Sequence, residues 1–360
     1  MRPRVPSAGM TSASSRARGA LCGLSAAILF GASAPVSKLL LPELGPLIMA
    51  GLLYLGAGLG LTLYGLVRPR SRVAREARLT RRDLGLLAGV ALCGGILGPV
   101  LMLVGLGRVS GLAGSLLLNL EAPFTMLLAV LFFREHLGRR GLVAALLIIG
   151  GGLLLSWRPG VLHADPWGIL AIAGACLSWG IDNNLTQRLS LRDPVAVVRW
   201  KTLGAAACTL AVGVGFRHDL PAPTVAAAAA GLGSLSYGAS IVLDMYALRL
   251  LGAAREAAFF ATAPFMGAAL AVPILGDRFG MAEVGAALLM ASGVVLLIRE
   301  KHAHAHDHEP LEHEHVHVHD EHHQHSHDRP AAEPHSHLHR HEPIAHEHPH
   351  LPDLHHRHRH

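Results

Sequence analysis

Long apolar runs follow one another along most of this chain, and they constrain its fold more than any other feature. A helix needs roughly 20 apolar residues to cross a hydrocarbon core of ~30 Å. Backbone amides cannot stay unpaired in lipid, and the runs are too long and continuous to be the strands of a barrel. The sequence therefore predicts an all-α membrane protein with ten transmembrane helices, at approximately 19–41, 45–67, 84–107, 110–133, 141–157, 166–187, 194–216, 224–247, 252–275 and 279–298.

The composition agrees with a lipid environment, because 51% of the residues are hydrophobic and only 16% are charged. Such a chain is too apolar for an ordinary soluble protein. No nucleophile–base pair and no cofactor-binding motif stands out, so the chain is not expected to be an enzyme or to require a cofactor. The four cysteines lie inside apolar runs and lack the paired spacing of a zinc site or a disulfide framework.

The lysines and arginines predict the topology. Basic loops resist translocation and collect in the cytoplasm. With a cytoplasmic N-terminus, twenty Lys and Arg fall in inside segments and four, Arg108, Arg158, Arg217 and Arg278, fall in outside segments. This asymmetry predicts a multi-pass protein of the inner (plasma) membrane with both termini cytoplasmic. It also explains most of the basic excess, so the expected partner is the lipid bilayer and not nucleic acid.

An internal repeat divides the apolar region in two. Shifting the chain by 141 residues superposes 108–124 on 249–265 without a gap, and six positions are identical. Since each half has an odd number of predicted spans, the two halves are expected to lie in opposite orientations across the membrane. The predicted organisation is a basic N-terminus at 1–18, two inverted five-helix repeats at 19–157 and 166–298, and a tail at 299–360.

The fourth predicted span carries a family resemblance. The run Leu118-Asn119-Leu120-Glu121-Ala122-Pro123-Phe124 is followed by an apolar stretch, then Arg134-Glu135-His136-Leu137 and the glycine-rich span from Gly141 to Trp157. Thr262-Ala263-Pro264-Phe265 repeats the motif in the second half. This pattern resembles the EamA type of the drug/metabolite transporter superfamily over residues 19–298. The resemblance implies ten helices, cytoplasmic termini and a substrate path between the halves, but no particular substrate.

Polar residues inside the predicted spans are the candidates for a substrate or ion path. An ionised carboxylate at a helix centre costs about 2.5–3.5 kcal/mol on insertion scales, and Glu121 falls near the middle of the fourth span. Pro123 removes a backbone hydrogen bond beside it, so the carboxylate and a freed carbonyl are expected to bind a cation or cycle a proton. The alternative is a protonated or paired glutamate that only fixes helix packing. Asn119 and Pro264, from the motif and its repeat, are further candidates.

A second polar cluster, Asp182, Asn183 and Asn184, lies in the sixth predicted span. Three adjacent residues cannot all face one side of a helix. At least one is therefore expected to face the interior, unless the cluster lies near the cytoplasmic headgroups. Asp244 in the eighth predicted span is a similar candidate.

Other charged residues near span ends are interpreted as structural. Lys201 starts the seventh predicted span, where a long side chain can reach the interface. Arg255 and Glu256 are adjacent at the start of the ninth, and local neutralisation is expected there. These residues are not expected to contact a substrate.

The tail is rich in histidine, because only three of the 26 histidines lie outside residues 301–360. Imidazole is a ligand for Ni, Co, Zn and Cu, and interspersed Asp, Glu and Pro argue against an expression tag. With few large apolar residues, the tail is expected to be disordered. It is expected to bind divalent metal (Ni, Co or Zn) at many weak, equivalent sites. The expected ligands are His302, His304, His306, His308, His313, His315, His317, His319, His335, His337, His339 and His341.

Three functions are compatible with these features. A secondary transporter that exports a small solute on a proton or substrate gradient is favoured, since no ATPase motif is present. Its sharper version is efflux of nickel or cobalt, with the tail capturing ions near the entrance, although no histidine lies in the middle of a predicted span. The alternatives are a general metabolite, amino-acid or drug exporter with the tail as a metal buffer, and a non-transporting membrane-tethered metal buffer or sensor. A homodimer is left open.

Overall fold

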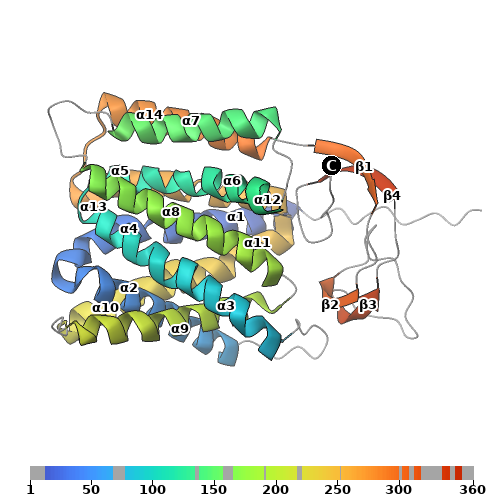
Figure 1. The fold of residues 1–360 in the computed structure, drawn as a ribbon, viewed down its shortest axis with the longest axis horizontal. Coiled ribbons are helices and arrows are strands. Elements are labelled where there is room, and N and C mark those ends of the chain that lie inside the picture. Colours follow the sequence, from blue (N-terminus) through green and yellow to red (C-terminus); the bar gives the residue numbers. More distant parts are fainter. Residues whose placement is uncertain are drawn as a thin grey trace, which may run out of the picture.

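The computed structural model describes residues 13–67, 78–133, 138–156, 165–189, 192–216, 221–251, 253–299, 302–307, 312–317, 335–340 and 345–350. Up to residue 299, its helices form one bundle in which they run roughly side by side (Figure 1). The first half contains α1 (Ala13–Gly31), α2 (Ser33–Val67), α3 (Leu84–Val90), α4 (Gly98–Leu106), α5 (Gly111–Leu117), α6 (Glu121–Phe133) and α7 (Arg139–Ser156). The second contains α8 (Pro166–Thr186), α9 (Pro194–Gly215), α10 (Pro223–Gly233), α11 (Ser240–Leu251), α12 (Ala253–Phe260), α13 (Ala263–Leu275) and α14 (Met281–Ile298).

Five short segments of other helix types join these elements. Three are 3₁₀ turns: η1 (Arg81–Asp83), η3 (Leu118–Leu120) and η4 (Gln187–Leu189). Two are π-helices: η2 (Ala91–Leu97) and η5 (Ser234–Ala239). Since π-helical turns are rare and occur frequently at functional sites, their positions matter for the site described below.

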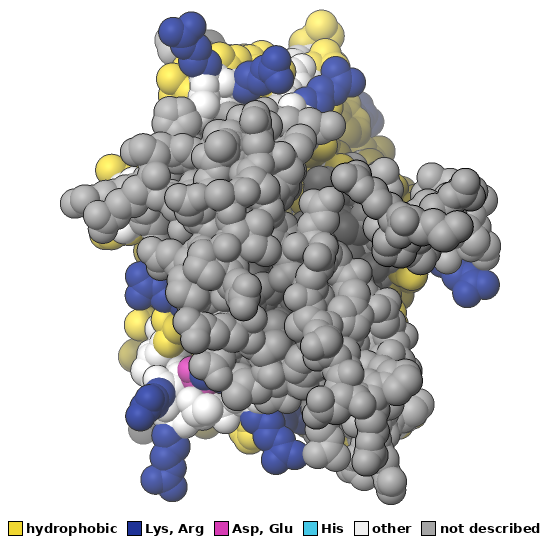
Figure 2. Space-filling view, turned by 90° about the vertical axis from the view of Figure 1, so that its right-hand side faces the viewer, with side chains coloured by type: hydrophobic (Ala, Val, Ile, Leu, Met, Phe, Trp, Pro, Cys, Tyr) yellow, Lys and Arg dark blue, Asp and Glu magenta, His cyan; other side chains and the backbone are white. Residues whose placement is uncertain are grey.

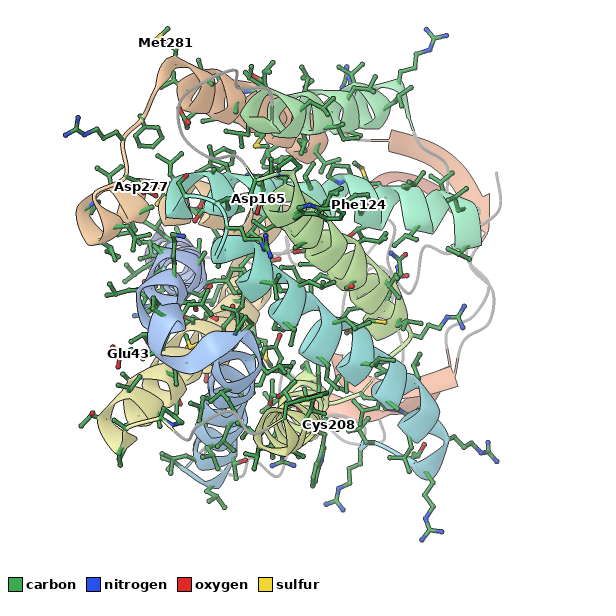
Figure 3. All side chains as sticks on the ribbon, turned by 60° about the vertical axis from the view of Figure 1, so that its left-hand side comes forward. Glu43, Phe124, Asp165, Cys208, Asp277 and Met281 are labelled. Atoms are coloured by element: carbon green, nitrogen blue, oxygen red, sulfur yellow. The ribbon has the colours of Figure 1, made fainter. Side chains whose placement is uncertain are left out.

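The first two predicted spans form one described run that turns at Gly45. The run Ala17–Val67 has 51 residues, which at 1.5 Å per residue would measure about 75 Å, more than twice the thickness of a bilayer core. Gly45 interrupts α2 with φ 66° and ψ 161°, a conformation that glycine adopts without a Cβ clash. Prolines at 42 and 46 flank this break. The run is therefore long enough for two membrane crossings, and Glu43 lies at the turn within it (Figure 3).

Among the described residues, seven helical runs are long and apolar enough to cross a membrane. Because the first run contains two predicted spans, the seven correspond to eight of the ten, and α7 and α8 are not among them. The prediction of a helical membrane body is confirmed. The number of ten spans stays a prediction.

Glycines allow the helices to pack closely in antiparallel pairs. A Cβ at Gly151 of α7 would lie 2.7 Å from Met290 Cγ of α14, and one at Gly293 of α14 would lie 2.8 Å from the Ala144 carbonyl oxygen of α7. These distances are shorter than real Cβ contacts, so the pairing requires glycine on both helices. Residue 151 of one helix thus lies near 290 of the other, and 144 lies near 293, which places the start of α7 beside the end of α14.

Two apolar cores meet at α8. Ala175 and Trp179 belong to the core formed with α2, α4 and α9, whereas Ile172 and Cys176 belong to the core formed with α5, α7, α13 and α14. Large apolar side chains also cover outward faces of several helices, among them Leu63, Leu131, Phe132, Leu153, Trp167 and Leu288. Exposed apolar residues in such number indicate a surface that faces lipid.

Exposed basic residues lie at both ends of the bundle. The described chain enters α1 and leaves α14 at the same end, where the tail begins (Figure 1). Lys and Arg side chains stand around the rim of that end (Figure 2). The exposed arginines at the corresponding helix ends are Arg18, Arg78, Arg81, Arg82, Arg139, Arg140, Arg188 and Arg299. Arg108 and Arg278 are exposed at helix ends on the opposite side. Which end of the bundle faces the cytoplasm stays a prediction.

The described tail segments are strands, not disordered chain. They are β1 (His302–Asp307), β2 (Glu312–His317), β3 (His335–Arg340) and β4 (Ala345–His350). β1 pairs antiparallel with β4, and β2 with β3. The prediction of disorder is wrong for these four segments. It missed backbone pairing, which supplies hydrogen bonds without a large apolar core. The rest of the tail, including His308, His319 and His341, lies outside the described residues.

Candidate functional site

Glu121 lies at a break in the regular α-helical hydrogen bonding, where the 3₁₀ turn η3 ends and α6 begins within the helical run Gly111–Phe132. The sequence predicted a carbonyl freed by Pro123 within a continuous helix. Pro123 instead lies in the first turn of α6, where a missing amide hydrogen is tolerated. Asn119 is buried and donates through Nδ2 to the Leu116 carbonyl at 2.9 Å, so it satisfies its own helix end. The site candidate from this motif is therefore the Glu121 carboxyl group.

Glu121 contacts the second half of the chain. Asn183 Nδ2 of α8 donates to Glu121 Oε1 at 2.7 Å and lies 3.4 Å from Thr125 Oγ1. Asn184 donates to the Thr125 carbonyl at 3.2 Å and to the Gly180 carbonyl at 2.8 Å, so it ties α8 to α6. Asn183 is exposed, whereas Asn184 is buried. The two candidate clusters of the sequence thus form one site at the α6–α8 contact.

Asp182 forms a buried ion pair with Lys201 of α9. The side chains are only 6% and 16% exposed, so Lys201 does not snorkel to the interface as the sequence suggested. Thr186 Oγ1 also donates to Asp182 Oδ1 at 3.2 Å. The pair neutralises two charges that would each be costly inside a bilayer. Asp182 and Asn183 are adjacent in α8, so one rotation of this helix places Asp182 at Lys201 and Asn183 at Glu121.

The π-helix η2 provides an acceptor at this site. The Gly98 amide donates five residues back, to the Cys93 carbonyl, so the next π-type donor to the Gly94 carbonyl would be residue 99. Pro99 has no amide hydrogen. The Gly94 carbonyl accepts instead from Tyr54 Oη at 2.8 Å and from Trp179 Nε1 at 3.2 Å. A helix irregularity in the third predicted span thereby joins α2 to α8.

Aromatic residues extend the site from η2 to η5. The Tyr54 and Tyr237 rings lie 5.6 Å apart, and Phe30 packs edge-on to Tyr237 at 5.5 Å. Tyr237 Oη of η5 contacts Ser33 Oγ at 3.3 Å. Both tyrosines are buried. Each of the two π-helices therefore places a polar group against α2, one from each half of the chain.

Asp244 does not join this cluster. Its carboxyl group hydrogen-bonds to Glu256 of α12, while its Oδ1 atom is buried without a hydrogen-bond partner among the described residues. The sequence paired Glu256 with Arg255, whose side chain lies outside the described residues. Pro264 lies in the first turn of α13, after a break at 261–262 that resembles the break before α6.

At the end of the bundle away from the tail, the carboxylates of Asp165 and Asp277 accept hydrogen bonds at helix N-termini (Figure 3). Asp165 accepts from the Trp167 amide at 2.9 Å and from Arg108 Nη1 at 2.7 Å. The hydrogen bond from Arg108 lowers the pKa of the Asp165 carboxyl below its usual value. Asp277 Oδ2 accepts from the Leu112 amide at 2.8 Å, at the start of α5. These contacts orient α8 and α5, which carry or adjoin the site.

Among the side chains that the structure describes, no group of three or more His, Cys, Asp or Glu could hold a metal ion. Glu121 has amide and hydroxyl neighbours instead. The predicted tail ligands lie partly in β1, β2 and β3, where the structure describes their backbone. Metal binding by the tail stays a prediction.

Comparison with known proteins agrees with this architecture. The apolar bundle with its central polar cluster defines a polytopic membrane protein. The EamA-like transporter family matches residues 17–157 and again 166–299, so the chain belongs to this family and is a membrane solute transporter. An uncharacterized transporter of Methanothermobacter thermautotrophicus is 29% identical over 289 residues, which cover 76% of this chain and 84% of that protein. A crystal structure of a protein 19% identical to this chain has a TM-score of 0.56, covers 78% of this chain and 96% of its own, and shows likeness of fold alone.

Proposed function

We propose that this chain is a secondary exporter of a small solute in the inner (plasma) membrane, and that Glu121 binds the solute or a coupling proton. The observation that carries this proposal is the hydrogen bond between Glu121 and Asn183 at 2.7 Å, which connects the two halves at a helix break. A carboxyl group at the contact of two mobile halves can exchange a proton or a cation as that contact opens and closes.

The transport path is proposed to lie between two inverted five-helix repeats, with ten crossings and both termini cytoplasmic. Two features support the repeat. The family matches the two halves separately. A shift of 141 residues also carries η2 to 232–238, which overlaps η5 at 234–239, and carries Glu121, where α6 begins, to 262, one residue before α13 begins. Exchange of conformations between such halves would interconvert inward-open and outward-open states.

A divalent metal is a second candidate for the transported solute. It is favoured by the tail, where histidine alternates with other residues in all four described strands. In this version the tail gathers Ni, Co or Zn in the cytoplasm and raises their concentration at the entrance. If the solute is organic, the same tail acts as a metal buffer.

Growth of a deletion strain separates these candidates. Cells that carry the wild-type chain, a chain lacking residues 301–360, or Glu121→Gln are compared under nickel, cobalt, zinc and amino-acid stress. Export by the body predicts that Glu121→Gln abolishes resistance to one of these stresses, whereas the exposed Glu43→Gln, matched in chemistry, does not. Metal resistance that the tail deletion abolishes and Glu121→Gln leaves intact would show a metal-buffering tail. Wild-type resistance of the Glu121→Gln strain to every stress would contradict export through Glu121.

A further inference from the structure

The strand pairs of the tail place histidine opposite histidine at six register positions. In the β1–β4 sheet the opposed residues are His302 and His350, His304 and His348, and His306 and His346. In the β2–β3 sheet they are His313 and His339, His315 and His337, and His317 and His335. No histidine of these strands lies opposite a residue of another type.

The geometry of an antiparallel strand pair brings these opposed histidine positions close together. Directly opposed residues have Cβ atoms about 4.5–5.5 Å apart, whereas alternate residues of one strand are about 6.7 Å apart. The nearest histidine position to each histidine is therefore on the partner strand. Because opposed residues and alternate residues share a face, each sheet has six histidine positions on one face.

The remaining positions agree with the same register. Glu312 lies opposite Arg340 at the end of the β2–β3 sheet, and opposite charges at such positions are favourable. Histidine opposite histidine is unfavourable when both rings are protonated, because like charges then face each other. A metal ion reverses this, since it binds neutral imidazole and is shared by both strands.

We propose that a divalent transition metal is bound between opposed histidines of paired strands, so that each tail sheet is a metal site built from two segments distant in sequence. The proposal rests on the proposed metal binding of the tail and goes beyond it, because it assigns the ligand pairs. Two adjacent histidine pairs supply four imidazoles, the number that tetrahedral zinc takes.

Cross-strand binding would couple metal to tail folding. β2 and β3 lie between β1 and β4 in the sequence, so metal in the β1–β4 sheet closes the longer loop around the inner sheet. Four ligands, two from each strand, hold an ion more tightly than two neighbours on one strand, because the second pair binds at high effective concentration once the first pair has bound. The tail then has two defined sites instead of many equivalent weak ones.

The test compares two full-length variants that each lose six histidines. The first removes a whole sheet by changing the histidines of β2 and β3 to Ala: His313, His315, His317, His335, His337 and His339. The second removes one strand from each sheet by changing those of β1 and β2: His302, His304, His306, His313, His315 and His317. Zn²⁺ binding to the purified proteins in detergent is measured by equilibrium dialysis against a competing chelator at pH 7.5, and gel filtration checks that the body is intact.

Cross-strand sites predict that the first variant keeps wild-type affinity with about half the tight sites, and that the second loses tight binding, with a dissociation constant on the order of 100-fold higher. Equal affinity and stoichiometry in the two variants would overturn the cross-strand assignment while leaving metal binding by the tail intact. A wild-type protein that does not bind Zn²⁺ more tightly than a chain lacking residues 301–360 would overturn both.

Discussion

At the residue scale, the site depends on the absence of a side chain at Gly94. A Cβ there would overlap the Asp182 carboxylate and would lie 2.6 Å from Lys201 Nζ. The ion pair therefore packs directly against the backbone of η2. The Gly94 carbonyl of this backbone also accepts hydrogen bonds from Tyr54 and Trp179. One small residue thus allows α2, α8 and α9 to meet.

Gly94→Ala is expected to lower the free energy of unfolding by about 1–3 kcal/mol, the range of overpacked cores. Thermal unfolding in detergent measures the change. Gly85→Ala is the matched control, because nothing lies within 4 Å of a Cβ at Gly85, and alanine in a helix gains about 0.5–1 kcal/mol over glycine. Equal melting temperatures for the two variants would show that the contact at Gly94 has no energetic role.

The Asp182–Lys201 pair predicts a strongly non-additive mutant cycle. Asp182→Leu or Lys201→Met alone leaves one buried charge without its partner and is expected to cost about 3–5 kcal/mol. The double variant removes both charges and is expected to recover most of this loss. Unfolding of the four proteins is measured under one condition. Additive losses would contradict a buried pair and favour two charges solvated separately.

Sequence patterns identified the polar residues of this site but not all of their partners. Glu121, Asp182 and Asn183 stood out because they interrupt apolar runs. Lys201 was interpreted as an interface residue because its position near a span end suggests snorkelling, and Glu256 was paired with its sequence neighbour. Gly94 gave no signal among 40 glycines. The contacts join helices far apart in the chain, and hydropathy does not specify which helices adjoin.

At the element scale, irregular helices define the site more than regular ones do. η2 and η5 occupy overlapping positions in the two halves, and α6 and α13 each begin after a break. Hydropathy predicted the helices and most of their limits because lipid requires long apolar runs. It could not predict π-turns, which change the hydrogen-bond partner of a backbone amide without changing composition.

Pro99→Ala tests how η2 is held. The alanine amide would supply the Gly94 carbonyl with a backbone donor in competition with Tyr54. In the wild-type chain, Tyr54→Phe is expected to cost about 1 kcal/mol, the net value of one hydrogen bond. After this change the Gly94 carbonyl of the wild-type chain keeps, among the described residues, only the donor from Trp179 at 3.2 Å. In the Pro99→Ala background it also has the amide of the new alanine, so the same change is expected to cost less. Identical costs in the two backgrounds, measured by thermal unfolding, would place the acceptor elsewhere.

The contact of Arg108 with Asp165 at the start of α8 predicts that the stability of the protein depends on pH. The pKa of Asp165 is lowered by its hydrogen bond from Arg108, so the stabilisation is present above the unfolded pKa of about 3.9 and is lost as pH falls through the folded value. The melting temperature of Arg108→Gln should therefore lie below that of the wild type at pH 6, and the difference should shrink as pH falls below about 3.9. Arg278→Gln, an exposed arginine at the same end, serves as control. A wild-type advantage that stays constant as pH falls below about 3.9 would contradict this contact.

At the scale of the whole molecule, the two proposed repeats differ in chemistry. Glu121 of the first half corresponds to Thr262 of the second, whose hydroxyl donates to the Phe259 carbonyl at 2.6 Å. Under the proposed repeat, the site is therefore asymmetric between the two halves. The tail adds a second kind of polar group, the histidine side chain. The strand register of the tail could not be predicted from the sequence, because a repeating histidine pattern fits many registers.

The inverted arrangement of the halves is the central claim, and cysteine accessibility in intact cells tests it most directly. Cys22, Cys93, Cys176 and Cys208 are replaced by alanine, and single cysteines are then placed at Arg82, Arg299, Arg108 and Arg278. An impermeant thiol reagent added outside is expected to label positions 108 and 278, and to label positions 82 and 299 only after the membrane is opened. Labelling of position 299 from outside, with position 82 protected, would place the ends of the bundle on opposite faces and contradict the account.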